Sequence, residues 1–272
     1  MSHIPVFILA GGYGTRLSEE TSVRPKPMVE IGEIPILIHI MRHYYSYGFK
    51  DFVICAGYKS WEIKSFFLNY SYRCENLEIQ FSGSRAPLIR TLNSNQHATE
   101  DWRVRVLDTG ESAMTGARLA RALDILDQDD FESFALTYGD GLCDVNLRNE
   151  YGFHFEHAKI GTVLGVRPLA RFGELFVNDK NLVQSFQEKP QSSGTFINGG
   201  FFFFRRSFRK YLSTEDQCVL EQAPLTELAE DRELVMFPHE GFWHPMDTLR
   251  DKNYLQNLWK SGEAPWVITN KA

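Results

Sequence analysis

Short apolar runs and helix-like apolar patterns alternate along this chain. Residues 4–10, 51–56 and 161–166 are dominated by apolar side chains, and runs of this length beside turn residues are typical of buried strands. Residues 36–47 instead carry apolar side chains three and four positions apart, which predicts a helix, and Gly48 stands where that helix should end. This alternation is typical of an α/β protein with a mainly parallel sheet.

Other segments repeat these two patterns. We expect further strands at 134–138, 175–177, 182–186 and 195–204, and helices at 60–70, 115–126, 222–230 and 248–260, with one more helix after residue 145. Residues 82–103 are polar and aperiodic, so we expect an irregular surface segment there, and the sequence gives no role for residues 82–100. No repeat or linker interrupts the chain, which predicts a single domain over residues 1–272 with an elaboration from about residue 205.

Composition narrows the class of protein. Lys and Arg number 29 and Asp and Glu number 35, for a net charge of −6. A general nucleic-acid binder usually carries a basic excess, so we expect no nucleic-acid partner, although a locally positive site can still bind a small anion. No apolar run approaches the roughly 20 residues of a membrane span, so we expect no membrane partner.

The spacing of the cysteines disfavours two further kinds of site. Cys55, Cys74, Cys143 and Cys218 are far apart and form no C-x-x-C pair. This spacing argues against a zinc site and against a disulfide framework, and it favours a reducing, cytoplasmic location.

A glycine cluster follows the first predicted strand, in the sequence Leu9-Ala-Gly-Gly-Tyr-Gly-Thr-Arg16. Glycines let backbone N–H groups surround an anion. Leu17 occupies the third glycine position of a dinucleotide fingerprint, which disfavours a nicotinamide oxidoreductase, and no Walker lysine follows. A tight turn would also explain the glycines, but Thr15 and Arg16 add phosphate-binding groups and favour a phosphate site.

Lys26 lies between two prolines. Pro27 restricts Lys26 to an extended backbone, and Pro25 does the same to Arg24. Such restraint suits a cation that must reach a fixed target, whereas the alternative is a stiff surface turn with a solvated lysine.

Two carboxylates are candidates for binding a metal. Asp140 follows a predicted strand and lies between Gly139 and Gly141, where it is approachable. Magnesium is usually held by one or two carboxylates together with substrate phosphates. Asp247 is the second candidate, although it could equally cap the helix that we expect after it.

These motifs together resemble those of the sugar-nucleotide pyrophosphorylases, which are nucleotidyltransferases acting on sugar 1-phosphates. The resemblance rests on Leu9–Leu17, Pro25-Lys26-Pro27, Tyr138–Gly141 and Glu188-Lys189-Pro190. Within the family, the chain is most similar to the branch that transfers a cytidylyl group to glucose 1-phosphate. The segments that indicate this branch are 17–21, 108–118, 186–190, 197–201, 245–251 and 264–266.

The resemblance implies a Rossmann-like, mainly parallel sheet flanked by helices, of the nucleotide-diphospho-sugar transferase type. It implies magnesium-dependent transfer of CMP from CTP to α-D-glucose 1-phosphate, which yields CDP-glucose and pyrophosphate. In the family, CDP-glucose supplies the synthesis of deoxysugars for surface polysaccharides. A homo-oligomer is also implied, with a hexamer as one candidate assembly.

The resemblance also assigns site residues. It places the following residues at the nucleotide: Leu9, Ala10, Gly11, Gly12, Tyr13, Gly14, Thr15, Arg16, Lys26, Ala113, Arg118 and Gly139. Arg16 and Lys26 would act catalytically by offsetting charge on the phosphates. Asp140 and Asp247 would hold Mg²⁺. The sugar phosphate would contact Glu188, Lys189 and Asn198.

The residues leave the choice of base open. Ala113 stands where we expect a small polar side chain, so a side-chain hydrogen bond is missing there. Arg118 could donate to cytosine, yet a related transferase that uses UTP or TTP fits the same motifs. A catalytically inactive, nucleotide-sensing regulator is a further alternative, which the intact Arg16, Lys26, Asp140 and Asp247 disfavour.

Overall fold

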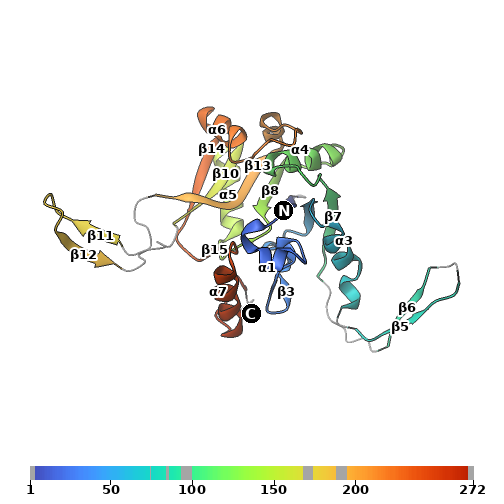
Figure 1. The fold of residues 1–272 in the computed structure, drawn as a ribbon. Helices are drawn as coiled ribbons and strands as arrows, with labels where there is room; N and C mark the ends of the chain where they lie inside the picture. The colour runs from blue at the N-terminus through green and yellow to red at the C-terminus, as the bar shows by residue number, and fades with distance from the viewer. Residues whose placement is uncertain are drawn as a thin grey trace.

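The computed structural model describes residues 4–73, 75–83, 86–92, 100–167, 174–187 and 195–268. Its centre is a seven-stranded sheet in the order β14-β10-β13-β8-β1-β4-β7 (Figure 1). The strands are β1 Pro5–Ala10, β4 Asp51–Ala56, β7 Arg103–Asp108, β8 Ser133–Tyr138, β10 Gly161–Val166, β13 Ile197–Arg205 and β14 Leu234–His239. β13 runs antiparallel to its neighbours β10 and β8, and the other adjacent pairs are parallel. The predicted mainly parallel α/β fold is therefore confirmed.

Helices cover both faces of this sheet. Successive side chains of β1 point to opposite faces of the sheet. Val6 and Ile8 lie in the apolar core on one face, and Phe7 and Leu9 lie in the core on the other. Helices α2 Ile36–Ser46, α3 Ser60–Leu68, α5 Leu147–His157 and α7 Leu249–Lys260 contribute to the first core, and α4 Thr115–Ile125 and α6 Ala223–Glu230 contribute to the second. Burial on both faces explains why β1 is apolar throughout.

Short strands and helical turns form the chain segments that surround the carboxyl ends of β1 and β8. Strand β9, Gly141–Cys143, pairs antiparallel with β15, Trp243–Pro245, and β2, Glu30–Ile31, pairs with β3, Ile34–Pro35. The short helix α1 spans Ser18–Thr21, and 3₁₀ turns lie at Thr15–Leu17, Lys26–Met28, Tyr70–Tyr72 and Arg206–Tyr211. The β9–β15 ladder brings the segments before β9 and after β15 together, because Met246 N donates to Asp140 O at 2.8 Å.

Two β-hairpins extend away from the body of the molecule, on different sides of it (Figure 1). One joins β5 Leu77–Gln80 to β6 Leu88–Thr91, and the other joins β11 Glu174–Val177 to β12 Val183–Gln187. No helix in the described part of the chain combines the length and the apolar character that crossing a membrane requires.

Several expectations need correction. The segment 82–103 is not wholly irregular, because β6 lies within it and β7 begins at its end. Strand β7 lies at the edge of the sheet and alternates polar with apolar residues, so it lacks the run that identified buried strands. Strand β14 was not predicted although it contains the apolar run 234–237, and the three-residue strands β9 and β15 are too short to show a pattern, whereas 51–56 and 161–166 are strands as predicted.

Helix α5 places a carboxyl group in the core. Glu150 is fully buried, and neither carboxyl oxygen has a hydrogen-bond partner among the described residues. Burial raises its pKa to about 8. The folded protein therefore keeps the Glu150 proton at neutral pH, whereas the unfolded chain releases it above its ordinary pKa of 4.5.

Replacing Glu150 with glutamine should change how stability depends on pH. Between the unfolded pKa of 4.5 and the folded pKa of about 8, the wild-type free energy of unfolding falls with rising pH. The fall amounts to at most about 1.4 kcal/mol per pH unit. Urea denaturation should therefore show Glu150→Gln gaining stability relative to wild type between pH 5 and pH 8. Glu156→Gln, on an exposed site of the same helix, is the matched control, and an identical pH trend in both variants would contradict this account.

Candidate active site

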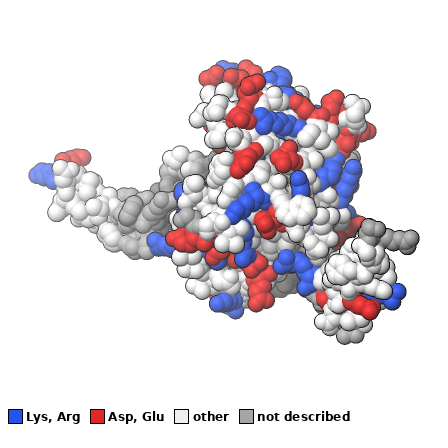
Figure 2. All heavy atoms as spheres, turned by 45° about the vertical axis from the view of Figure 1, so that its right-hand side comes forward, with Lys and Arg blue, Asp and Glu red and all other residues white. Residues whose placement is uncertain are grey.

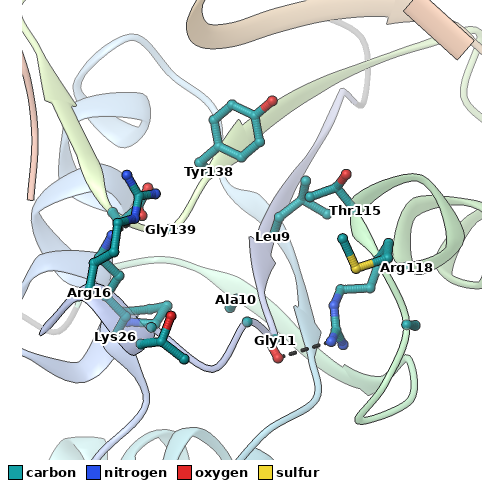
Figure 3. Close-up of a pocket in the computed structure, with 16 residues that line it drawn as sticks. Leu9, Ala10, Gly11, Arg16, Lys26, Thr115, Arg118, Tyr138 and Gly139 are labelled. Atoms are coloured by element: carbon teal, nitrogen blue, oxygen red, sulfur yellow. Dashed lines mark hydrogen bonds and ion pairs between the residues drawn. The ribbon is translucent and has the colours of Figure 1, made fainter. Parts of the chain in front are cut away.

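A pocket of about 330 Å³ opens beyond the carboxyl ends of β1 and β8 (Figure 3). Open α/β sheets place their ligands at this edge. Sixteen residues line it: Leu9, Ala10, Gly11, Gly12, Gly14, Thr15, Arg16, Lys26, Pro27, Ala113, Met114, Thr115, Arg118, Tyr138, Gly139 and Asp140. The pocket thus brings together most of the residues expected at a nucleotide, from four separate stretches of the chain.

The glycine loop after β1 can hold its shape only without side chains at certain positions. A Cβ atom on Gly11 would lie 2.1 Å from the Arg118 guanidinium. Gly14 has φ +64°, and a Cβ there would lie 2.7 Å from Thr21. The Thr21 hydroxyl donates to Gly14 O at 3.0 Å, which fixes the far end of the loop. The loop is therefore a preorganised turn with exposed backbone at Gly12, suited to an anion.

Lys26 is the centre of an ionic network. Its Nζ donates to Asp140 Oδ2 and to Asp247 Oδ1, each at 2.7 Å, and Arg16 Nη1 donates to Asp247 Oδ2 at 2.9 Å. Burial alone would lower the pKa of Lys26, but the charges and hydrogen bonds of the two carboxylates outweigh it, and the pKa is raised. Lys26 therefore stays protonated across the physiological pH range.

Both alternative interpretations of these residues are wrong. Lys26 is only 8% exposed, so it does not lie on a solvated surface turn. The expected extended backbone at Lys26 is also wrong, because Pro25 is extended, with φ −65° and ψ 149°, but Lys26 itself begins a 3₁₀ turn. Asp247 does not cap the following helix, because Thr248 is its N-cap and forms a capping box with Asp251. The Asp247 carboxylate is thereby left to face Lys26 and Arg16.

Arg118 lines the pocket, but its terminal nitrogens already bind backbone carbonyls. Nη2 donates to Gly11 O at 2.9 Å and to Glu111 O at 3.0 Å, and Nη1 donates to Gly110 O at 2.5 Å. The side chain is 4% exposed. In this state Arg118 holds two loops of the pocket wall together, so direct donation to a base would require one of these bonds to be released.

Sequence reasoning missed part of the opposite wall. Tyr138 Oη donates to Glu221, and Thr115 Oγ1 donates to the same carboxylate at 2.8 Å. Glu221 follows α4 by about a hundred residues and belongs to no recognisable motif, so no sequence signal marked it. It anchors two side chains that line the pocket.

The remaining predicted residues lie elsewhere. Tyr13 is half-exposed beside the pocket, with its ring 5.1 Å from that of Tyr58. Asn198 does not line the pocket, and its Oδ1 accepts from Gly200 N at 2.8 Å next to a bulge between β10 and β13. Glu188 and Lys189 lie outside the described residues.

The arrangement suits charged, phosphate-bearing ligands. Arg16 and Lys26 lie on one side of the pocket and Arg118 on the other, with the glycine loop between them (Figure 3). Asp140 and Asp247 converge on a cation already, and such a carboxylate pair also fits a divalent metal ion with its preference for oxygen ligands.

Comparison with known proteins relates this pocket to a family. Residues 5–248 match the family described as Nucleotidyl transferase. The chain is 47% identical over 259 residues to the glucose-1-phosphate cytidylyltransferase of Salmonella typhimurium, covering 95% of this chain and 97% of the other. It is 36% identical over 261 residues to a Bacillus subtilis protein named as a probable glucose-1-phosphate cytidylyltransferase, covering 96% and 98%. A solved UDP-glucose pyrophosphorylase in complex with UDP-glucose shares the fold, with TM-score 0.65, 13% identity and coverage of 95% and 99%.

Removing the Lys26 charge should strengthen metal binding at the carboxylates in the absence of nucleotide. Lys26→Met leaves Asp140 and Asp247 facing each other without their shared cation. Hydrogen bonds to charged groups contribute about 1.5–3 kcal/mol, so the affinity for free Mn²⁺ should rise about tenfold to a hundredfold. Titration of Mn²⁺ followed by electron paramagnetic resonance measures this directly. Lys50→Met, at a surface ion pair, is the control, and a Lys26→Met affinity equal to that of wild type would refute the competition.

Proposed function

The chain belongs to the nucleotidyl transferase family, and we propose that it transfers CMP from CTP to glucose 1-phosphate, giving CDP-glucose and pyrophosphate. The observation that carries the proposal is 47% identity to a curated glucose-1-phosphate cytidylyltransferase across nearly the whole of both chains. The pocket supports it, because its glycine loop and basic residues suit a nucleoside triphosphate.

The proposed reaction needs no protein nucleophile. An anionic phosphate oxygen of glucose 1-phosphate attacks the α-phosphorus of CTP in line, a new P–O bond forms, and the bond to pyrophosphate breaks. The contribution of the protein is then to position the two substrates and to neutralise charge. We assign charge neutralisation to Arg16 and Lys26, and phosphate binding to the backbone of residues 10–15.

Nucleotidyltransferases of this family generally use a divalent metal ion, and we propose Mg²⁺ here. Asp140 and Asp247 would hold it, since their oxygens already converge on one cation. When bound, the ion supplies charge neutralisation at the substrate phosphates. Lys26 must then release at least one carboxylate, which frees its ammonium group to donate to a phosphate oxygen.

The proposed sugar-phosphate residues are Glu188, Lys189 and Asn198. Support for Asn198 comes from its position on β13, where its Oδ1 accepts from Gly200 N at 2.8 Å and Gly200 packs so closely on the Tyr138 ring that a Cβ there would lie 2.4 Å from it. Tyr138 in turn lines the pocket beside Gly139 and Asp140. A ligand that extends from the nucleotide site past Tyr138 would therefore reach Asn198.

The decisive experiment is pyrophosphate release with glucose 1-phosphate and Mg²⁺, measured in parallel with CTP, UTP, TTP, ATP and GTP. Release with CTP and none of the others is the expected result. Release with UTP or TTP instead would keep the reaction and overturn the choice of base. Binding of CTP without any release would identify a nucleotide-sensing regulator.

Two substitutions should separate the assigned roles. Lys26→Ala and Asp140→Asn should each lower kcat about 10²- to 10³-fold, as expected for the loss of one group that stabilises developing charge. Steady-state kinetics at saturating CTP measures the effect, and Asp140→Asn should also raise the Mg²⁺ concentration needed for half-maximal rate. Lys50→Ala on the surface is the control. Near-native turnover in either site variant would remove that residue from the mechanism.

We also propose that the protein assembles with copies of itself through its two hairpins. A two-stranded hairpin is marginally stable alone in water. Each hairpin nevertheless exposes a facing apolar pair, Ile79 opposite Ile89 in β5–β6 and Leu175 opposite Phe186 in β11–β12. The described part of the arm at the left of Figure 2 is mainly white, with its charged residues at the tip. Contact with another copy would bury these side chains.

Charges placed on the apolar face of one hairpin should dissociate the assembly. The double variant Ile79→Glu, Ile89→Glu puts two like charges on that face, and light scattering after size exclusion should show a lower mass than for wild type. The control is Glu78→Gln with Arg90→Gln, the adjacent pair on the opposite face of the same hairpin. An unchanged mass in the first variant would contradict a role for β5–β6 in assembly.

A further inference from the structure

Three side chains of types that bind metal ions lie close together at one end of the β9–β15 ladder. Asp140 lies at the opposite end. Cys143 ends β9, Asp144 follows it, and His239 ends β14. Cys143 Sγ, one Asp144 carboxylate oxygen and one His239 ring nitrogen all lie within 4.8 Å of one another. Asp144 N donates to Phe242 O at 3.1 Å, so the ladder itself holds the two strands at this distance.

The Asp144 carboxylate faces the His239 ring. Its Oδ1 lies 2.9 Å from His239 Nε2, within ion-pair distance, and that ring nitrogen also lies 3.3 Å from Phe242 O. No other described residue donates a hydrogen bond to this buried oxygen. A metal ion bound between Asp144 and His239 would satisfy the oxygen and the ring nitrogen together.

Gly241 leaves room for this cluster. A Cβ atom on Gly241 would lie 2.5 Å from Asp144 Oδ1 and 2.9 Å from His239 Nε2. Its φ is not in the left-handed region, so the backbone itself would accept alanine. Close approach to the donor atoms, rather than turn geometry, is what a side chain at this position would disturb.

We propose that Cys143, Asp144 and His239 form a binding site for a zinc-like transition-metal ion, distinct from the carboxylate pair at Asp140 and Asp247. Sulfur, imidazole and carboxylate are the donors that Zn²⁺ prefers. Tetrahedral bonds of about 2.0–2.3 Å place donor atoms about 3.3–3.8 Å apart, which small side-chain shifts achieve here. Water completes the coordination, and the thiol proton passes to solvent on binding.

The site would act as a clamp on the ladder that carries the active-site carboxylates. Cys143 pairs with Trp243, and Gly141 pairs with Pro245, next to Asp140 and Met246 respectively. A metal ion joining β9 to the end of β14 would fix one end of this short ladder. Cysteine spacing alone disfavours zinc because Cys143 supplies the only sulfur of this cluster and His239 is far from it in sequence, so no local motif appears.

Cobalt provides a selective probe, because sulfur-to-cobalt charge transfer gives a near-ultraviolet band that oxygen-only sites lack. The chelator-treated, reduced, full-length protein should develop this band on addition of Co²⁺ and saturate at one equivalent. Zn²⁺ should abolish the band and excess Mg²⁺ should not. Zn²⁺ should also raise the melting temperature of wild type, since it binds the folded state.

Variants test the donors one by one. Cys143→Ser should lose the band, and His239→Gln should weaken Co²⁺ binding at least tenfold. Gly241→Ala keeps every donor yet should also weaken binding at least tenfold, because its Cβ collides with Asp144 Oδ1. The controls are Cys218→Ser, at a free cysteine elsewhere, and Gly152→Ala, where a Cβ meets nothing within 4 Å.

The outcomes are clear in either direction. Loss in all three site variants with retention in both controls supports the site. No band in wild type, a band that survives Cys143→Ser, or wild-type affinity in His239→Gln or Gly241→Ala overturns it. Gly241→Ala keeps the test valid should the buried Cys143→Ser variant fail to fold.

Discussion

Two carboxylates that face the same point require a cation between them, and Lys26 meets that requirement. Asp140 and Asp247 reach Lys26 from segments far apart in sequence, and each lies 2.7 Å from its ammonium nitrogen. The like charges of the carboxylates would otherwise repel at short range. The proline-bounded turn, the end of β8 and the segment after β15 are therefore fixed relative to one another by one ionic contact.

The contact of Lys26 with Asp140 and Asp247 depends on the short β9–β15 ladder, which joins the two segments that carry these carboxylates. With three residues in each strand, it gains little from its own pairing and depends on what lies at its ends. At one end, Met246 N binds Asp140 O, and the capping box of Thr248 and Asp251 starts α7 directly after Asp247. At the other end lie Cys143, Asp144 and His239. Oxygen donors thus collect at one end, and a mixed set with sulfur and nitrogen at the other.

The sequence predicted the buried part of this fold well and its edges poorly. Strands β4 and β10 lie inside the sheet and carry apolar runs, so their bounds could be read directly. Strand β7 lies at one edge, where polar residues are tolerated and no apolar run appears, whereas β14, at the other edge, has the short apolar run 234–237 and was not predicted. The glycine loop and Lys26 could be predicted from local sequence motifs, and both line the pocket. Glu221 anchors Thr115, and the guanidinium of Arg118 donates to a backbone carbonyl of a distant loop. Both are tertiary contacts, so no local sequence pattern predicts them.

The charge of the site has a consequence for a ligand as anionic as a nucleoside triphosphate. Arg16 and Lys26 contribute two positive charges, and Asp140 and Asp247 contribute two negative charges, so the network is formally neutral. Positive and negative residues are also interspersed over the face in Figure 2, which offers no broad electropositive surface. Arg118 adds a positive charge at the pocket wall, but its terminal nitrogens already bind backbone carbonyls. Attraction of a triphosphate therefore depends largely on the backbone N–H groups of the glycine loop. A divalent ion held by Asp140 and Asp247, as proposed, would add to this attraction and would leave Lys26 free to donate to the phosphates.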